Sequence, residues 1–355
     1  MKPAWAICIF ISILVSVAVL SACRSGSSAH HLLFAVSHGS NQVAALDIAG
    51  SGVLNSTGTP ADTGPSPVAL AVLPSRKFAY AADFSSNDVA TISVAGTGKL
   101  TSTTTKTATG AGPVAMAIAP DGSALYVANQ TDKNVSMFTV DGSSGSLSAV
   151  TGSPFSLGFT PSAMTITPSG KYLYISSSSN GQVYGYSTQS SSTPTFISAT
   201  PAGTSPFALA VDPGNRFLLV TDTVANTVSL FTIQSGGGLA ATQGSPYGAG
   251  TTPVATTTDA KGRFVYVVNH GSNDISAFGL SAAGQLTPIS GSPIPVGASP
   301  SSVAADQQSN FLYVASQGAN NIAGFAIDPN SGALRAISGS PFSTVAEPVS
   351  IRIVD

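Results

Sequence analysis

The sequence predicts an all-β protein, a seven-bladed β-propeller built from four-stranded blades. The first observation is a repeat, because a proline that opens a short apolar segment returns every 45 to 48 residues. These prolines are Pro67, Pro113, Pro161, Pro206, Pro253, Pro300 and Pro348. The second observation is that each interval holds four short strands separated by turns, which is the pattern of one propeller blade. A helical repeat is excluded, since no long stretch has apolar residues at spacings of three and four.

The stretch 113–148 shows one repeat in chain order. PVAMAI alternates large and small apolar residues, as an inner strand needs when blades pack face to face. The alternative, a two-sheet sandwich, predicts apolar–polar alternation instead. APDG is a tight-turn sequence and precedes a second strand, ALYVAN. A turn at Asn134 opens the third strand, NVSMFTV, and a Gly-rich turn with Leu147 opens the fourth.

The first repeat lacks its inner strand. Residues 32–59 match only the second, third and fourth strands of the unit, and the missing strand returns at the far end as PVSIRIVD, residues 348–355. We therefore predict that residues 32–355 form one domain in which the C-terminal strand joins the N-terminal blade. This closure leaves no exposed sheet edge at the seam.

Residues 1–23 are predicted to be a lipoprotein signal peptide. Lys2 precedes an apolar run that ends in Leu-Ser-Ala-Cys, and this ending resembles the bacterial lipoprotein box. The resemblance implies lipidation of Cys23, with residues 24–31 as a flexible tether. An uncleaved anchor is the alternative, because the apolar run approaches the length that spans a bilayer. Both alternatives predict a membrane-anchored, extracytoplasmic protein, in the periplasm or at the cell surface.

The composition limits the partners. Charged residues make up 8% of the chain, with 13 basic and 15 acidic residues, and no basic stripe is present. Nucleic-acid binding is therefore not expected, and the membrane is reached through the lipid anchor. Cys8 and Cys23 are the two cysteines, so the propeller has no disulfide. No metal and no cofactor are predicted, because the sequence shows neither metal-ligand spacing nor a phosphate-binding loop.

One end of the ring is predicted to carry the ligand site. In a propeller, the turn after each second strand and the crossing to the next blade lie at the same end. That end receives six residue pairs, which we call the crown: Ser37-His38, Asp83-Phe84, Asn129-Gln130, Asp222-Thr223, Asn269-His270 and Ser316-Gln317. The crown predicts a site at the channel mouth with Asp83, Asn129, Asp222, Asn269 and His270 as ligand-binding residues. The alternative is that Asp and Asn cap their own turns.

Three residues are candidate catalytic groups. His38 and His270 occupy equivalent positions in the first and sixth blades, and imidazole can serve as acid or base near neutral pH. Arg352 is a charged residue in a predicted inner strand, at a position where other repeats have alanine. It either faces the channel and binds an anion or pairs with an acidic residue such as Asp306.

The repeats resemble those of a known family. YVANQTDKNVSMFTVD and YVVNHGSNDISAFGL resemble YVTN-type repeats of surface propellers. TGSPF (151–155), SGSPF (338–342) and PDGSALYVAN are similar to the seven-bladed lactonase family, which includes 6-phosphogluconolactonase. The resemblance covers residues 32–355 and implies the same fold and lactone hydrolysis. Active members carry His-Pro-His, Gly-Pro-Arg-His and Asn-Glu-Leu segments, whereas the matching crossings here read Gly64-Pro65-Ser66-Pro67 and Gly203-Thr204-Ser205-Pro206.

Three functions are therefore considered. The first hypothesis is a module that binds a small molecule, a glycan or an envelope protein at the crown, because the family's acid–base motifs are missing. The alternative is a lactone hydrolase, which needs a base for water and a group that stabilises the oxyanion. His270 or His38, together with Arg352, are its candidates. The third is a scaffold without a ligand site.

Overall fold

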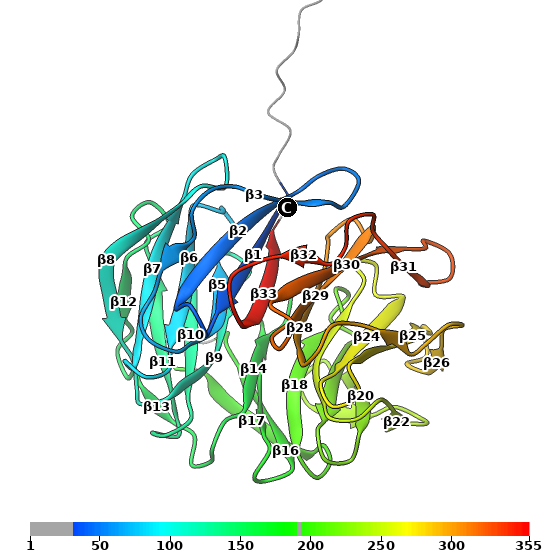
Figure 1. The fold of residues 1–355 in the computed structure, drawn as a ribbon. Coiled ribbons are helices and arrows are strands. Elements are labelled where there is room, and N and C mark those ends of the chain that lie inside the picture. Colours follow the sequence, from blue (N-terminus) through cyan, green and yellow to red (C-terminus); the bar gives the residue numbers. More distant parts are fainter. Residues whose placement is uncertain (1–30, 190–192, 355) are drawn as a thin grey trace, which may run out of the picture.

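The computed structural model describes residues 31–189 and 193–354, which form a closed ring of seven antiparallel sheets (Figure 1). The predicted all-β propeller of seven four-stranded blades is confirmed. The predicted signal peptide, Cys23 and the tether up to residue 30 lie outside the described residues. Within the described part of the chain, no helix is long and apolar enough to cross a membrane.

The strands of each blade follow one another from the channel outward. Blade 1 contains β33 (Pro348–Val354), β1 (Leu32–Ser37), β2 (Gln42–Ile48), β3 (Leu54–Ser56) and β4 (Ala61–Asp62). Blade 2 contains β5 (Pro67–Val72), β6 (Phe78–Asp83), β7 (Asp88–Val94) and β8 (Leu100–Ala108). Blade 3 contains β9 (Pro113–Ile118), β10 (Ala124–Asn129), β11 (Asn134–Val140), β12 (Leu147–Ala149) and β13 (Phe155–Ser156). Blade 4 contains β14 (Ala163–Ile166), β15 (Tyr172–Ser177), β16 (Gln182–Ser187) and β17 (Thr195–Pro201).

The remaining three blades repeat the arrangement of blade 3. Blade 5 contains β18 (Pro206–Val211), β19 (Phe217–Asp222), β20 (Thr227–Ile233), β21 (Leu239–Ala241) and β22 (Tyr247–Gly248). Blade 6 contains β23 (Pro253–Thr258), β24 (Phe264–Asn269), β25 (Asp274–Leu280), β26 (Leu286–Pro288) and β27 (Ile294–Pro295). Blade 7 contains β28 (Pro300–Ala305), β29 (Phe311–Ser316), β30 (Asn321–Ile327), β31 (Leu334–Ala336) and β32 (Phe342–Ser343).

The outermost strand is broken into two short pieces in five blades, for example β26 and β27, which both pair with β25. In blades 3, 5, 6 and 7 the break lies at a Gly-Ser-Pro motif. In blade 6 the hydroxyl of Ser292 accepts a hydrogen bond from the Ala277 amide at 2.9 Å, and in blade 7 Ser340 accepts from Gly324 at 2.9 Å. A serine hydroxyl therefore replaces the strand carbonyl at the break. The Gly-Ser-Pro motif therefore has a structural role at the outer edge of the blade, away from the channel.

The C-terminal strand closes the ring as predicted. In Figure 1, β33 lies beside β1, and their antiparallel register pairs Leu33 with Ile353. Blade 7 is tied to blade 1 across the seam, because the Tyr313 hydroxyl donates to the Gly52 carbonyl at 2.7 Å. Backbone and side-chain hydrogen bonds therefore join the two ends of the chain.

Buried tyrosines join neighbouring blades at three further places. The hydroxyls of Tyr80, Tyr174 and Tyr266 donate to glycine carbonyls in the next blade at 2.8 to 3.1 Å. Burial raises the pKa of these phenols, that of Tyr80 to about 12, so they stay protonated donors. In blades 2, 4, 6 and 7 the tyrosine of the second strand thus packs between blades and donates a hydrogen bond to the next blade.

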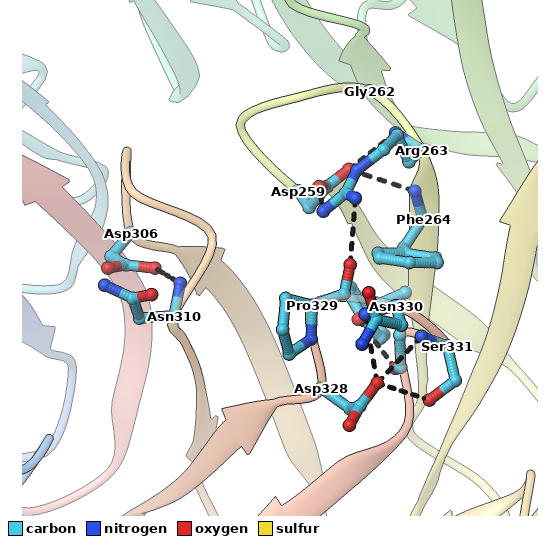
Figure 2. Close-up of polar contacts among 12 residues, drawn as sticks. Asp259, Gly262, Arg263, Phe264, Asp306, Asn310, Asp328, Pro329, Asn330 and Ser331 are labelled. Atoms are coloured by element: carbon cyan, nitrogen blue, oxygen red, sulfur yellow. Dashed lines mark hydrogen bonds and ion pairs between the residues drawn. The ribbon is translucent and has the colours of Figure 1, made fainter.

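Aspartates at the end opposite the crown form turns (Figure 2). The Asp259 carboxylate accepts hydrogen bonds from the backbone amides of Arg263 and Phe264 at 2.6 and 2.9 Å. Arg263 then reaches blade 7, where it donates to the Pro329 carbonyl at 2.8 Å. These contacts join blades 6 and 7 at the end of the ring opposite the channel mouth.

Candidate active site

A cavity of about 530 Å³ occupies the channel mouth at the crown end. Inner strands of all seven blades line it, with residues such as Ala69, Ser350 and Phe207. The ends of four second strands add polar side chains to its rim. These are Gln130, Ser178, His270 and Gln317.

The first member of each crown pair points into a turn. The side chains of Asp83, Asn129, Asp222 and Asn269 are fully buried, and none of the four lines the cavity. Asn269, for example, donates to the Asp274 carboxylate at 2.7 Å and to the Ser276 hydroxyl at 2.9 Å. The structure therefore gives these four predicted ligand-binding residues a turn-forming position, and of the five it brings only His270 to the cavity.

Among the four buried crown residues, Asp222 accepts the largest number of backbone hydrogen bonds. Its carboxylate accepts backbone hydrogen bonds from Thr204 and Ser205 on one oxygen and from Val224 and Ala225 on the other. Burial alone would raise the pKa of Asp222, but these four amides stabilise the carboxylate and lower it. Asp222 thus joins the crossing into blade 5 to the turn after β19.

Asp83 differs from its counterparts because it faces another carboxyl group. The Gly64 amide donates to one oxygen of Asp83 at 2.7 Å. The other oxygen is buried, as is Oδ1 of Asp88, and neither finds a hydrogen-bond donor among the described residues. Burial, followed by the contact with Asp88, raises the pKa of Asp83 to about 7. Asp83 therefore holds a proton more readily than an ordinary carboxyl group, at the position where Asn269 supplies an amide to Asp274.

His270 is the titratable group at the mouth. Its Nδ1 lies 3.1 Å from the carbonyl oxygen of Pro300 in the neighbouring blade. A carbonyl oxygen only accepts hydrogen bonds, so the neutral ring carries its hydrogen on Nδ1. No described residue makes a hydrogen bond with Nε2, and the side chain of His270 lines the cavity.

His38 holds the equivalent place in blade 1 but does not line the cavity. Its Nδ1 lies 4.0 Å from Glu347, and both side chains are about half exposed. The backbone amide of His38 also donates to the Glu347 carbonyl at 3.1 Å. The structure therefore places His38 at the ring seam, apart from His270.

Arg352 lies on the channel face of β33, and its side chain is exposed to the lumen. The expected alternative, a pair with Asp306, is not formed, because no described residue makes a hydrogen bond or ion pair with Arg352. Asp306 accepts from the amide of Phe311 at 2.8 Å and from that of Asn310 at 2.7 Å, and Figure 2 shows the second contact. Enclosure by the ring lowers the pKa of Arg352 from its ordinary value through lost hydration. The arginine remains a cation facing the channel.

Gln130 and Gln317 belong to crown pairs, but the sequence prediction selected Asn129 in the first of these pairs and neither residue in the second. Neither amide side chain bonds to another described residue, so both are free to contact a ligand at the mouth. A signal was present in the repeats. The first members are all Ser, Asp or Asn, as a shared turn requires, whereas the second members differ between blades, as residues at a site do.

The described residues contain no group of three or more His, Cys, Asp or Glu side chains arranged to hold a metal ion. The side chains at the mouth include an imidazole, two amides, a guanidinium and several serine and threonine hydroxyls. Such a set suits acyl transfer to water, which needs a proton acceptor and donors for a developing oxyanion.

The family model described as Lactonase, 7-bladed beta-propeller matches residues 24–114, 91–158, 151–256 and 240–353. The chain belongs to this family. The family resemblance seen in the sequence is thereby confirmed. Among curated proteins, none matches the chain at a significant level.

Solved structures of similar fold include three bacterial proteins. A candidate 6-phosphogluconolactonase from Bacteroides uniformis is 18% identical, with a TM-score of 0.80 over 92% of this chain and 100% of that one. A candidate 6-phosphogluconolactonase from Bacteroides fragilis is 19% identical, with a TM-score of 0.81 over 93% and 99%. A periplasmic gluconolactonase from Pseudomonas aeruginosa is 21% identical, with a TM-score of 0.76 over 92% and 99%. These lactonase-family propellers share the fold of this chain over nearly its whole length.

Proposed function

We propose that the protein hydrolyses a lactone in the mouth cavity, with His270 as the general base. The observation that carries the proposal is the contact between Nδ1 of His270 and the Pro300 carbonyl. That contact places the ring hydrogen on Nδ1 and leaves Nε2, which has no hydrogen-bond partner among the described residues, as the proton acceptor of a ring that lines the cavity. From there Nε2 can remove a proton from a water molecule as its oxygen attacks the lactone carbonyl.

The remaining groups at the mouth supply the other half of the reaction. Attack by water converts the carbonyl into a tetrahedral oxyanion, which hydrogen-bond donors stabilise. Gln130 and Gln317 can donate from their side-chain amides, and Arg352 adds positive charge from deeper in the channel. The ring carbon–oxygen bond then breaks, and protonated His270 returns its proton to the leaving alkoxide. The product is the open hydroxy acid.

Family membership favours this function over the first hypothesis of a binding module. The similar structures from Bacteroides and Pseudomonas are named for 6-phosphogluconolactone and gluconolactone hydrolysis. The rim of this mouth is uncharged, with Gln130, Ser178, His270 and Gln317, and Arg352 is the one permanently charged side chain among the described residues that line the cavity, which is fewer donors than phosphate sites commonly gather. We therefore assign an unphosphorylated lactone, such as a sugar lactone, as the substrate class.

The proposal is tested with a panel of lactones followed in a pH-stat, which titrates the acid released. The panel contains gluconolactone, 6-phosphogluconolactone and simple aliphatic lactones. We expect one unphosphorylated lactone to be hydrolysed, and His270→Gln to lower kcat by about a hundredfold or more. A panel without turnover, combined with binding of a hydroxy acid at the mouth, would overturn hydrolysis and support the binding module.

We also propose that the protein is lipidated at Cys23 and acts outside the cytoplasm, in the periplasm or at the cell surface. The Leu-Ser-Ala-Cys sequence supports this assignment. Labelled palmitate should enter the wild-type protein but not a Cys23→Ser variant, which should leave the membrane fraction. Equal labelling of the two proteins would contradict the assignment.

A further inference from the structure

A second cavity, of about 230 Å³, lies below the mouth towards the other end of the channel, and we call it the lower cavity. Its side chains are apolar apart from Thr165 and Arg352. Residues Val72, Ile118 and Ile166 lie along its wall. Four residues line both the mouth and the lower cavity, and they form a ring segment that we call the waist: Leu70, Met116, Met164 and Arg352.

Arg352 has no evident structural task at the waist. Arg352 is the register partner of Phe34, the third residue of the second strand of blade 1. In the other six blades, the inner-strand residue that pairs with the third residue of the second strand is Ala or Thr. Six blades therefore fold without a charge at this position. Arg352 also carries the only permanent charge among the residues that line the two cavities. An unpaired cation in such surroundings attracts an anion.

The surroundings of Arg352 fit a carboxylate better than a phosphate. Phosphate sites in proteins gather several donors, commonly backbone amides of a helix N-terminus or a nest. The waist offers one guanidinium beside Leu70, Met116 and Met164. A single guanidinium can bind a planar carboxylate through two parallel hydrogen bonds. The apolar wall below it can accept a hydrocarbon chain.

We propose that Arg352 and the lower cavity bind a short aliphatic carboxylic acid, with its carboxylate on the guanidinium and its chain among Val72, Ile118 and Ile166. This site shares Arg352 with the proposed hydrolysis, but the wall that holds the hydrocarbon chain contains none of the mouth residues His270, Gln130 and Gln317.

Isothermal titration calorimetry with hexanoate, acetate, hexanamide and inorganic phosphate tests the proposal on the wild-type protein. Hexanoate should bind about tenfold or more tightly than acetate, because its additional methylenes enter the lower cavity. Hexanamide, which has the same chain without the charge, should bind at least about tenfold more weakly than hexanoate. Equal affinities for hexanoate and hexanamide, or tighter binding of phosphate than of hexanoate, would overturn the proposal.

Two variants locate the site. Arg352→Ala introduces the residue found in blades 2, 3, 5 and 7, and it should abolish hexanoate binding. Ile118→Thr introduces the residue that blade 6 holds as Thr258, and it should weaken hexanoate but not acetate. Arg335→Ala, at the exposed outer edge of blade 7, removes the same charge and should change nothing. Unchanged hexanoate affinity in Arg352→Ala would place the ligand elsewhere. None of these results depends on turnover of a lactone.

Discussion

The carboxyl pair of blade 2 makes the stability of the propeller depend on pH. Burial and the neighbouring Asp88 raise the pKa of Asp83 from 3.8 to about 7. Between these two values the folded protein holds a proton that the unfolded chain has released. The free energy of unfolding therefore falls as pH rises from about 4 to about 7, and the full penalty is present above pH 7.

Replacing Asp83 by asparagine should remove this penalty. The introduced side-chain amide would donate to Asp88 as Asn269 donates to Asp274 at 2.7 Å in blade 6. A difference of about three pKa units corresponds to an upper limit of roughly 4 kcal/mol. We expect Asp83→Asn to be more stable than the wild type at about pH 8, by one to a few kcal/mol, and nearly equal to it at about pH 4.

Denaturant unfolding of both proteins across this pH range measures the difference. Asn269→Asp is the matched control, because it creates the same carboxyl pair with Asp274 in blade 6. It should lose stability at about pH 8 and little at about pH 4. Parallel stability curves for the wild type and Asp83→Asn would refute the raised pKa of Asp83.

Three further predictions concern the contacts that hold the ring. Tyr313→Phe leaves the buried Gly52 carbonyl without its donor and should lower the free energy of unfolding by about 1–3 kcal/mol in denaturant titrations. Asp222→Ala removes the acceptor of four backbone amides and should destabilise the protein by about 3 kcal/mol or more; an effect below about 1 kcal/mol would contradict the turn-forming role. Deletion of residues 348–355 removes the inner strand of blade 1 and should lower the thermal midpoint followed by circular dichroism. An unchanged melt would contradict the closure.

The fold was predictable because each blade repeats the same local sequence pattern. A proline, a large–small alternating strand and two tight turns recur at one spacing, so a repeat with a weak pattern can still be recognised by comparison with the others. The seam was predictable for the same reason, since PVSIRIVD fills the one strand that the first repeat lacks. The break of the outer strand was not, because it depends on a hydroxyl such as that of Ser292 bonding the neighbouring strand.

The site was predicted only in part. The end of the ring that holds the mouth cavity followed from topology, and His270 and Arg352 both line that cavity. Successive side chains of a strand point in opposite directions. At the end of each second strand, the first member of a crown pair therefore points into the turn and the second member points away from it. Asn269 and His270 show the two directions. The absence of a partner for Arg352 among the described residues could not be read from the sequence, because it depends on how far the aspartate side chains of the neighbouring blades reach.

The account depends most on His270 acting from the cavity, and the repeat provides a matched comparison. His38 occupies the equivalent position in blade 1, outside the cavity, whereas His270 lines it. The decisive measurement is kcat/KM of His270→Gln and His38→Gln for the lactone that the wild type hydrolyses fastest. We predict a loss of about a hundredfold or more for His270→Gln and a wild-type value for His38→Gln. Equal losses in the two variants, or none in His270→Gln, would contradict the proposed mechanism.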